Sequence, residues 1–135
     1  MKIVGIDPGT HTGVAVYDKA TKKLSRLETF LAVQAEELVL DLFIAGDLER
    51  VYFEDSRLRT WFGGSGREKL QGAGSIKRDC SRWIEFLAHH KIPSKAIAPK
   101  DVMTKLTKQQ FLKITGWVAR SSQHSRDAAM LVFGR

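Results

Sequence analysis

Four side chains combine residue types and positions that suit metal-assisted cleavage of a phosphodiester: Asp7, Glu54, His124 and Asp127. Asp7 and Glu54 each close a short apolar run that predicts a buried strand. His124 and Asp127 lie three residues apart in a predicted helix, so both can face one site. Two Mg²⁺ ions about 3.5–4 Å apart can activate a water and stabilise the leaving alkoxide of such a reaction. Carboxylate oxygens suit Mg²⁺, and the histidine should make Mn²⁺ an effective substitute.

These residues also have purely structural interpretations. Asp7 is followed by Pro-Gly, and both Asp-Pro and Pro-Gly are common turn pairs. A histidine and an aspartate three apart on a helix more often share a surface hydrogen bond than a metal ion. The coincidence of this helical pair with two strand-end acids is what favours a metal site.

Glu54 has a neighbour that competes for its role. The structural alternative makes it a solvated acid at a strand end, paired with Arg57 or Arg59. Asp55 is the next residue, but strand alternation sends positions 54 and 55 to opposite faces of a sheet. If the strand that ends at Glu54 runs parallel to the first strand, Glu54 reaches the same sheet edge as Asp7, where α/β folds usually bind ligands.

The order of predicted elements indicates a single α/β domain over residues 1–135. Hydrophobic periodicity and turn residues predict, in order, strands at 3–6, 14–17 and 24–31, a helix from Ala32 to about Gly46, a strand at 50–55, a loop at 56–66, a helix at 67–90, a strand at 95–98, and helices at 107–114 and about 122–133. The first three strands form an antiparallel meander. Thr107 is a predicted helix cap, Gly116 a predicted helix stop, and Ser121 or Ser122 the cap of the last helix.

Small residues predict where helices approach other elements closely. Gly72 and Gly74 weaken the long helix by roughly 1 kcal/mol each relative to alanine, which a close helix approach would justify. Ala128 and Ala129 should let the last helix pack closely on the sheet.

The charge balance favours a polyanionic partner. The sequence has 22 Lys and Arg against 15 Asp and Glu, a net charge of +7, and each phosphate neutralised releases condensed counterions. The single cysteine, Cys80, cannot form an internal disulfide. With no predicted signal peptide and no apolar stretch long enough to span a bilayer, we expect a cytoplasmic protein.

Two motifs resemble the RuvC-type Holliday-junction resolvases. The segment Ile3-Val4-Gly5-Ile6-Asp7-Pro8-Gly9-Thr10, followed by Thr12-Gly13-Val14-Ala15, is similar to the opening of that family. His124-Ser125-Arg126-Asp127-Ala128 resembles its terminal signature, with His124 in place of the commoner acid. Glu54 matches the glutamate that closes the fourth strand, and Lys108 resembles the lysine that opens the penultimate helix and approaches DNA.

The resemblance implies an RNase H-like fold, with a mixed five-stranded sheet of one antiparallel meander and two parallel strands flanked by helices. It also implies a homodimer, formed through the helix at about 67–90, that nicks four-way DNA junctions with two Mg²⁺ or Mn²⁺ ions. Trp61 or Phe62 would act as an aromatic wedge at the junction. Candidate phosphate contacts are Arg57, Arg59, Lys69, Arg78, Lys100, Lys105 and Lys108. The chain is shorter than typical bacterial members and lacks the glycine-rich loop before Lys108, which indicates a divergent or phage-type member.

Other functions remain open on the sequence. A pre-ribosomal-RNA nuclease of the same fold has a similar opening hairpin, but its Asp-Glu-Arg segment is missing here. An ATP-binding fragment of the actin or sugar-kinase type would need a second phosphate hairpin, and no second Asp-x-Gly hairpin occurs. A non-catalytic DNA-junction-binding module is the third alternative, although all four ligand positions carry competent residue types.

Overall fold

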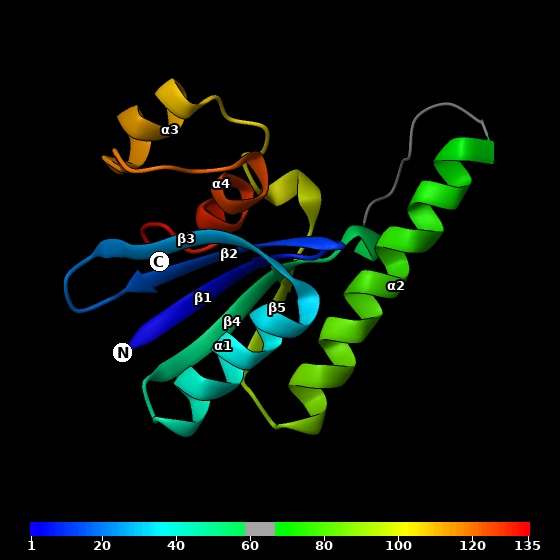
Figure 1. Ribbon diagram of the computed structural model, residues 1–135, viewed down its shortest axis with the longest axis horizontal. Helices are drawn as coiled ribbons and strands as arrows, with labels where there is room; N and C mark the ends of the chain where they lie inside the picture. Colours follow the sequence, from blue (N-terminus) through cyan, green and yellow to red (C-terminus); the bar gives the residue numbers. More distant parts are fainter. Residues whose placement is uncertain (59–66) are drawn as a thin grey trace.

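The computed structural model (Figure 1) describes residues 1–58 and 67–135 and, within the helix that begins at Arg67, the side chains from Lys77 onward together with Gly74. The elements follow the order β1 (Lys2–Asp7), β2 (His11–Asp18), β3 (Lys23–Leu31), α1 (Ala32–Ile44), β4 (Leu48–Glu54), a 3-10 turn (Ser56–Leu58), α2 (Arg67–His89), β5 (Ser94–Ile97), a second 3-10 turn (Pro99–Asp101), α3 (Lys108–Thr115) and α4 (Gln123–Met130). Each predicted strand and helix is therefore present, with ends that differ by a few residues.

The five strands form one mixed sheet in the order β3-β2-β1-β4-β5. β1 pairs antiparallel with β2, and β2 antiparallel with β3. β4 lies parallel to β1, and β5 parallel to β4. This topology confirms the predicted meander with two parallel strands, and it brings the carboxyl ends of β1 and β4 to the same edge.

Helices cover both faces of the sheet (Figure 1). On one face, Val4, Ile6 and Phe53 pack against α1 and against Trp83 and Leu87 of α2. On the other face, a second apolar cluster joins the sheet to α3 and α4 and includes Ile3, Ala15, Leu27, Ile97, Phe111, Ala128, Ala129 and Val132. The sheet is thus buried between two helical layers.

The predicted end of the last helix is wrong by one turn. α4 ends at Met130 and not at Phe133. The backbone N–H of Leu131 donates to Ala128 O at 3.2 Å, an i to i−3 bond that tightens the chain out of the α-helix. At the other end, Ser122 is the cap, because its side chain accepts from the backbone N–H of Ser125.

The predicted close approach at the glycines of α2 is not found where it can be described. A Cβ placed on Gly74 would meet nothing within 4 Å. The close approaches lie on the sheet instead, where a Cβ on Gly5 would sit 2.1 Å from Ala128 O, and one on Gly13 2.0 Å from His124 O. Both strand glycines therefore let the backbone of α4 touch the sheet.

Candidate active site

Four residues from four adjacent strands line up near the carboxyl edge of β1, and we call them the edge row: Thr29, Gly13, Asp7 and Glu54. Thr29 is the register partner of Gly13, and Gly13 is the partner of Asp7. On the other side of β1, Ile6 pairs with Phe53, so the next step along the parallel strands places Glu54 beside Asp7. Partners in neighbouring strands point to the same face, which is here the face that α4 covers.

α4 packs directly on the edge row because Gly13, at the point of contact, has no side chain. At Gly13 the backbone of His124 takes the space that any other residue would fill with its Cβ. The buried small residue Ala128 does the same one turn later, over Gly5. The two strand glycines therefore determine how closely the first turn of α4 packs on the sheet. That turn contains His124.

Asp7 and His124 meet as predicted. The His124 Nδ1 atom lies 3.1 Å from Asp7 Oδ2, with side-chain exposures of 53% for the histidine and 17% for the aspartate. Burial raises the pKa of Asp7, the hydrogen bond from His124 opposes that rise, and the nearby charge of Asp127 adds to it. The resulting pKa is about 6, against an ordinary value of 3.8. A carboxylate that is costly to ionise at this position is a natural site for a cation.

The two strand-end acids and the histidine share one hollow, which we call the edge pocket. Its volume is about 330 Å³. The pocket is lined by Asp7, Pro8, Gly9, Thr10, Glu54, Ser56, Asp79, Cys80 and His124. Three of the four predicted site residues, from β1, β4 and α4, therefore face the same space.

Asp127 is the fourth, and the structure uses it differently. Its Oδ1 atom accepts from the backbone N–H of Lys105 at 2.9 Å and from Gln123 Nε2 at 3.1 Å. Asp127 is not part of the edge-pocket lining, although its charge raises the pKa of Asp7. It lies near the site and also anchors the segment before α3.

The donor set suits a hard divalent cation, but the side chains are not gathered around a common point. Two carboxylates and an imidazole are appropriate ligands for Mg²⁺ or Mn²⁺. Within residues 1–58 and the described part of 67–135, no three His, Cys, Asp or Glu side chains lie close enough together to hold one ion. Ion binding by three of these side chains together would require them to move closer to one another.

The side chains of Glu54 and Asp55 lie in different surroundings, as strand alternation predicts. The Asp55 side chain is only 2% exposed, and Arg57 binds it with Nη2 2.9 Å from Oδ2. Burial opposes ionisation of Asp55, but the side-chain and backbone hydrogen bonds from Arg57 outweigh it and hold the pKa of Asp55 below its usual value. Arg57 therefore pairs with Asp55; Arg59, the other partner considered for Glu54, lies outside the described residues.

The remaining predicted DNA contacts are distributed around the molecule. Arg78, Lys100, Lys105 and Lys108 are exposed, and Lys108 opens α3. Lys105 has a left-handed backbone with φ of 56°. Arg59, Trp61, Phe62 and the side chain of Lys69 lie outside the described residues.

Asp79 is a pocket residue that the sequence analysis missed. It lies on α2 and lines the edge pocket together with Asp7 and Glu54. It precedes the buried Cys80 and lies one turn before the buried Trp83. The sequence feature that could have identified Asp79 is its position as an acid next to the apolar residues of a predicted helix.

No known protein-family model matches the sequence, and no curated protein matches it. Among solved structures, the chain is similar to T. thermophilus RuvC in complex with a Holliday junction substrate. The TM-score is 0.63 with 20% sequence identity, over 98% of this chain and 90% of that chain. The fold is RNase H-like, as in RuvC. In the part of the chain that the structure describes, no helix is both long and apolar enough to cross a membrane.

Proposed function

We propose that the chain is a metal-dependent endonuclease that cleaves four-way or otherwise branched DNA. The observation that carries this proposal is the convergence of Asp7, Glu54 and His124 on one pocket at the carboxyl edge of the sheet. Two further observations support it. The RuvC structure with the same fold is bound to a Holliday junction, and a net charge of +7 suits a polyanionic substrate.

Asp7, Glu54, His124 and Asp127 would hold two Mg²⁺ or Mn²⁺ ions. Bound ions would supply an activated water and stabilise the leaving oxygen of the phosphodiester. Asp7, the central residue of the set, would contact both ions, Glu54 one, and His124 with Asp127 the other. The pKa of Asp7 near 6 leaves part of this carboxyl protonated in the absence of a cation, so loading of the site should release protons and strengthen with pH.

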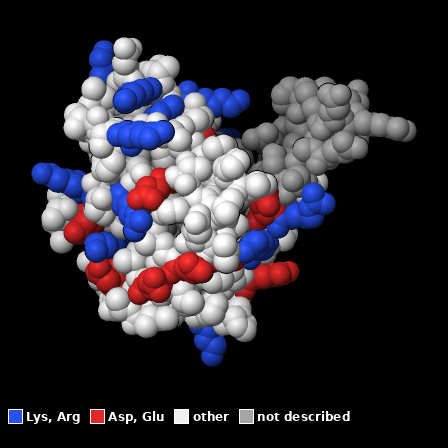
Figure 2. Space-filling model, viewed as in Figure 1, with Lys and Arg blue, Asp and Glu red and all other residues white. Residues whose placement is uncertain are grey.

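The DNA would approach from the side of α3 and α4. In Figure 2, Lys and Arg gather at the end of the molecule where α3 lies, while Asp and Glu gather over α1. The sequences of the helices agree with this division. α1 has three acids and no Lys or Arg, whereas α3 has two lysines and no acid. Lys100, Lys105 and Lys108 are the proposed phosphate contacts on this side, with Arg57, Arg59, Lys69 and Arg78 as further candidates.

A homodimer through α2 would suit a substrate with two equivalent strands. α2 has 23 residues, or about 34 Å at a rise of 1.5 Å per residue, and it runs well past the end of the sheet (Figure 1). Gly74 lies on this helix with open space around its Cα, so a second copy could approach closely there. Size-exclusion chromatography with light scattering would test this state directly.

The function is tested by cleavage of matched substrates that share one sequence. A four-way junction, a flap, a linear duplex and a structured RNA are incubated with Mg²⁺ or Mn²⁺, using wild type and Asp7→Asn. We expect paired nicks in the junction, little cutting of linear duplex, and no cutting by Asp7→Asn despite retained junction binding. Cleavage of RNA alone would favour the pre-ribosomal-RNA nuclease, and wild-type cutting by Asp7→Asn would reject the site.

A non-catalytic junction-binding module is the second candidate, because no three ligating side chains are gathered around one point in the described residues. The two candidates differ in their response to metal. For the enzyme, Mn²⁺ should raise the melting temperature of wild type and leave Asp7→Asn unchanged. A module that binds junctions but responds to no divalent cation would show neither the shift nor cleavage.

A further inference from the structure

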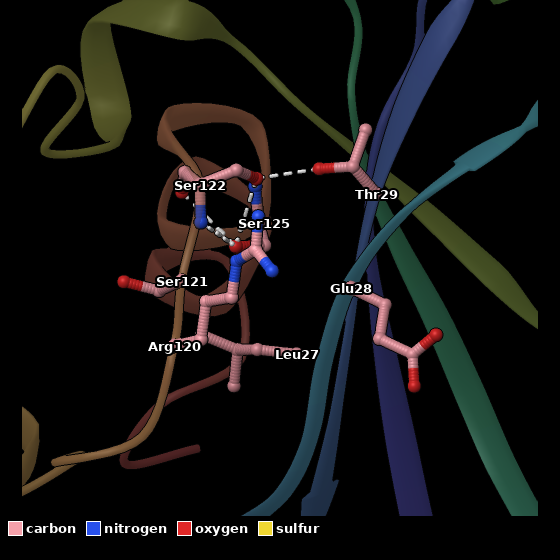
Figure 3. A pocket seen from close by; sticks show the side chains of 7 residues that line it. All are labelled: Leu27, Glu28, Thr29, Arg120, Ser121, Ser122 and Ser125. Carbon is pink, nitrogen blue, oxygen red and sulfur yellow. Dashed lines mark hydrogen bonds between the residues drawn. The ribbon is translucent and has the colours of Figure 1, made fainter.

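A larger hollow lies on the β3 side of the same sheet face, and we call it the β3 pocket. Its volume is about 500 Å³. Residues 27–29 of β3 form one wall, and residues 120–122 with Ser125 form the other. Figure 3 shows the two walls joined at one end by the hydrogen bond between the Thr29 and Ser122 hydroxyls.

The charge inside this pocket is positive. In Figure 3 the Arg120 side chain extends along the pocket beside Ser122 and Ser125. In the described part of the chain, no hydrogen bond or ion pair engages its guanidinium group; only its backbone carbonyl accepts, from Trp117 Nε1 at 3.3 Å. A guanidinium group without an internal partner is a ready donor to an external anion.

Glu28 does not cancel this charge, although it contributes to the lining. Strand alternation sends Glu28 to the opposite sheet face from Leu27 and Thr29, and Figure 3 shows its carboxylate pointing away from Arg120. On that opposite face, Arg26 Nε binds Glu28 Oε1 at 2.9 Å. The acid is thus neutralised by another residue outside the pocket.

The edge row gives the distance between the two pockets. Thr29, in the wall of the β3 pocket, is separated from Asp7 by the single strand that carries Gly13. Two strand spacings amount to about 10 Å. A nucleic acid strand rises roughly 3.4 Å per phosphate along the helix axis, and its winding places neighbouring phosphates about twice that distance apart in space, so this separation corresponds to one or two nucleotides. Ser122, the cap of α4, lines the β3 pocket, and His124, in the first turn of α4, lines the edge pocket.

We propose that the β3 pocket binds a backbone phosphate of the strand being cleaved, one or two nucleotides from the scissile bond, with Arg120 as the cationic donor. This inference rests on the proposed nuclease function. β3 is an edge strand of the sheet, so its outward-facing backbone N–H groups can also donate to a phosphate oxygen. The pocket would fix the register of the strand without reading its bases.

The test compares Arg120→Gln with the matched control Arg26→Gln. The control removes the same charge from the opposite face of β3. Junction binding is measured in Ca²⁺ or EDTA over a salt series. We expect Arg120→Gln to bind roughly tenfold more weakly and to flatten the log–log salt slope by about 0.7–0.9, whereas Arg26→Gln should match wild type. Equal slopes for all three proteins would overturn the proposal.

A second measurement locates the phosphate. Single neutral methylphosphonates are placed one to five nucleotides on either side of the cleavage site. Wild type should lose affinity at one position, one or two nucleotides away, and Arg120→Gln should be insensitive there. Equal sensitivity of both proteins at every position would overturn the assignment. Melting curves with inorganic phosphate test whether the pocket binds a free anion instead. A melting-temperature shift that depends on Arg120, together with unchanged DNA binding, would identify a small-anion site and reject a subsite for the DNA strand.

These readouts separate the two proposals. If the protein cuts no DNA but Arg120→Gln still flattens the salt slope, the proposed catalysis fails and the phosphate subsite stands. If cutting is normal and Arg120 has no effect on binding, the nuclease stands and the subsite fails.

Discussion

Replacing Gly13 by alanine should move the first turn of α4 and separate His124 from Asp7. The new Cβ would lie 2.0 Å from His124 O, and Cβ contacts under 3.0 Å essentially do not occur. The nearest atoms belong to backbone, so α4 must rise by at least 3.0 − 2.0 = 1.0 Å. The distance of 3.1 Å between His124 Nδ1 and Asp7 Oδ2 would then reach about 4 Å, beyond hydrogen-bonding range.

Two consequences follow for Gly13→Ala. Overpacking of this kind costs about 1–3 kcal/mol of unfolding free energy, and a clash with a helix backbone belongs at the upper end. Loss of the hydrogen bond from His124, which lowers the pKa of Asp7, should raise that pKa further above 6. Urea unfolding measures the first effect, and NMR titration of the Asp7 carboxyl measures the second.

Gly5→Ala is the matched control. Its Cβ would lie 2.1 Å from Ala128 O, so its cost in stability should be nearly the same. That clash falls one turn further along α4, about 6 Å away, and should disturb the Asp7–His124 contact much less. The reasoning is refuted if Gly13→Ala is as stable as wild type, or if both variants change the pKa of Asp7 and DNA cleavage equally.

Three further changes have predictable signs. Asp7 has a pKa of about 6 in the folded protein and about 3.8 in the unfolded chain. Between these two values the folded state keeps a proton that the unfolded state has lost. The free energy of unfolding should therefore fall by about 2–3 kcal/mol between pH 4 and pH 6. Asp7→Asn should remove this dependence and be more stable than wild type at pH 7.5 while losing cleavage, as pH-dependent urea unfolding and the cleavage assay would show. Gly74→Ala should stabilise a monomer by about 0.5–1 kcal/mol, because the site is open and helical, but should weaken a dimer whose copies meet there, which light scattering would detect. Arg57→Ala removes the guanidinium group that binds the buried Asp55 carboxylate, while the backbone N–H of residue 57 still donates to it, and should cost about 1–3 kcal/mol at pH 7. This loss should shrink as pH falls and Asp55 becomes protonated, whereas an Arg57 needed only for DNA would leave the melting temperature unchanged.

Features that depend on neighbouring residues could be predicted from the sequence. Thr107 caps α3 and accepts from Gln110 N, and Gly116 ends that helix with φ of 75°, both as expected from local rules. The convergence of Asp7 with Glu54 also followed, because each closes an apolar run and parallel strands bring their carboxyl ends to one edge. Strand alternation correctly separated Glu54 from Asp55.

Features set by contacts between distant segments could not be predicted in the same way. The close approach of α4 was assigned to small residues of the helix, and the complementary glycines Gly5 and Gly13 were read only as part of a motif. The position of Asp79 beside the edge pocket depends on how α2 crosses the end of the sheet. The anchoring of Asp127 depends on Lys105, whose left-handed backbone no local signal specified.

Asp127 would link the proposed metal site to the proposed DNA-binding side of the molecule. Both of its hydrogen bonds, from Lys105 N and Gln123 Nε2, use the Oδ1 atom. In the described residues no hydrogen bond or ion pair engages Oδ2, so that oxygen could serve a cation while Oδ1 keeps the segment before α3 in place. A cation bound to Oδ2 would weaken the hydrogen bond that Oδ1 accepts from Lys105 N–H, because the two interactions share the single negative charge of the carboxylate. If the proposed metal site is correct, the segment that carries Lys105 and leads to Lys108 would respond to metal, and ion binding would then affect the proposed contacts with the DNA backbone.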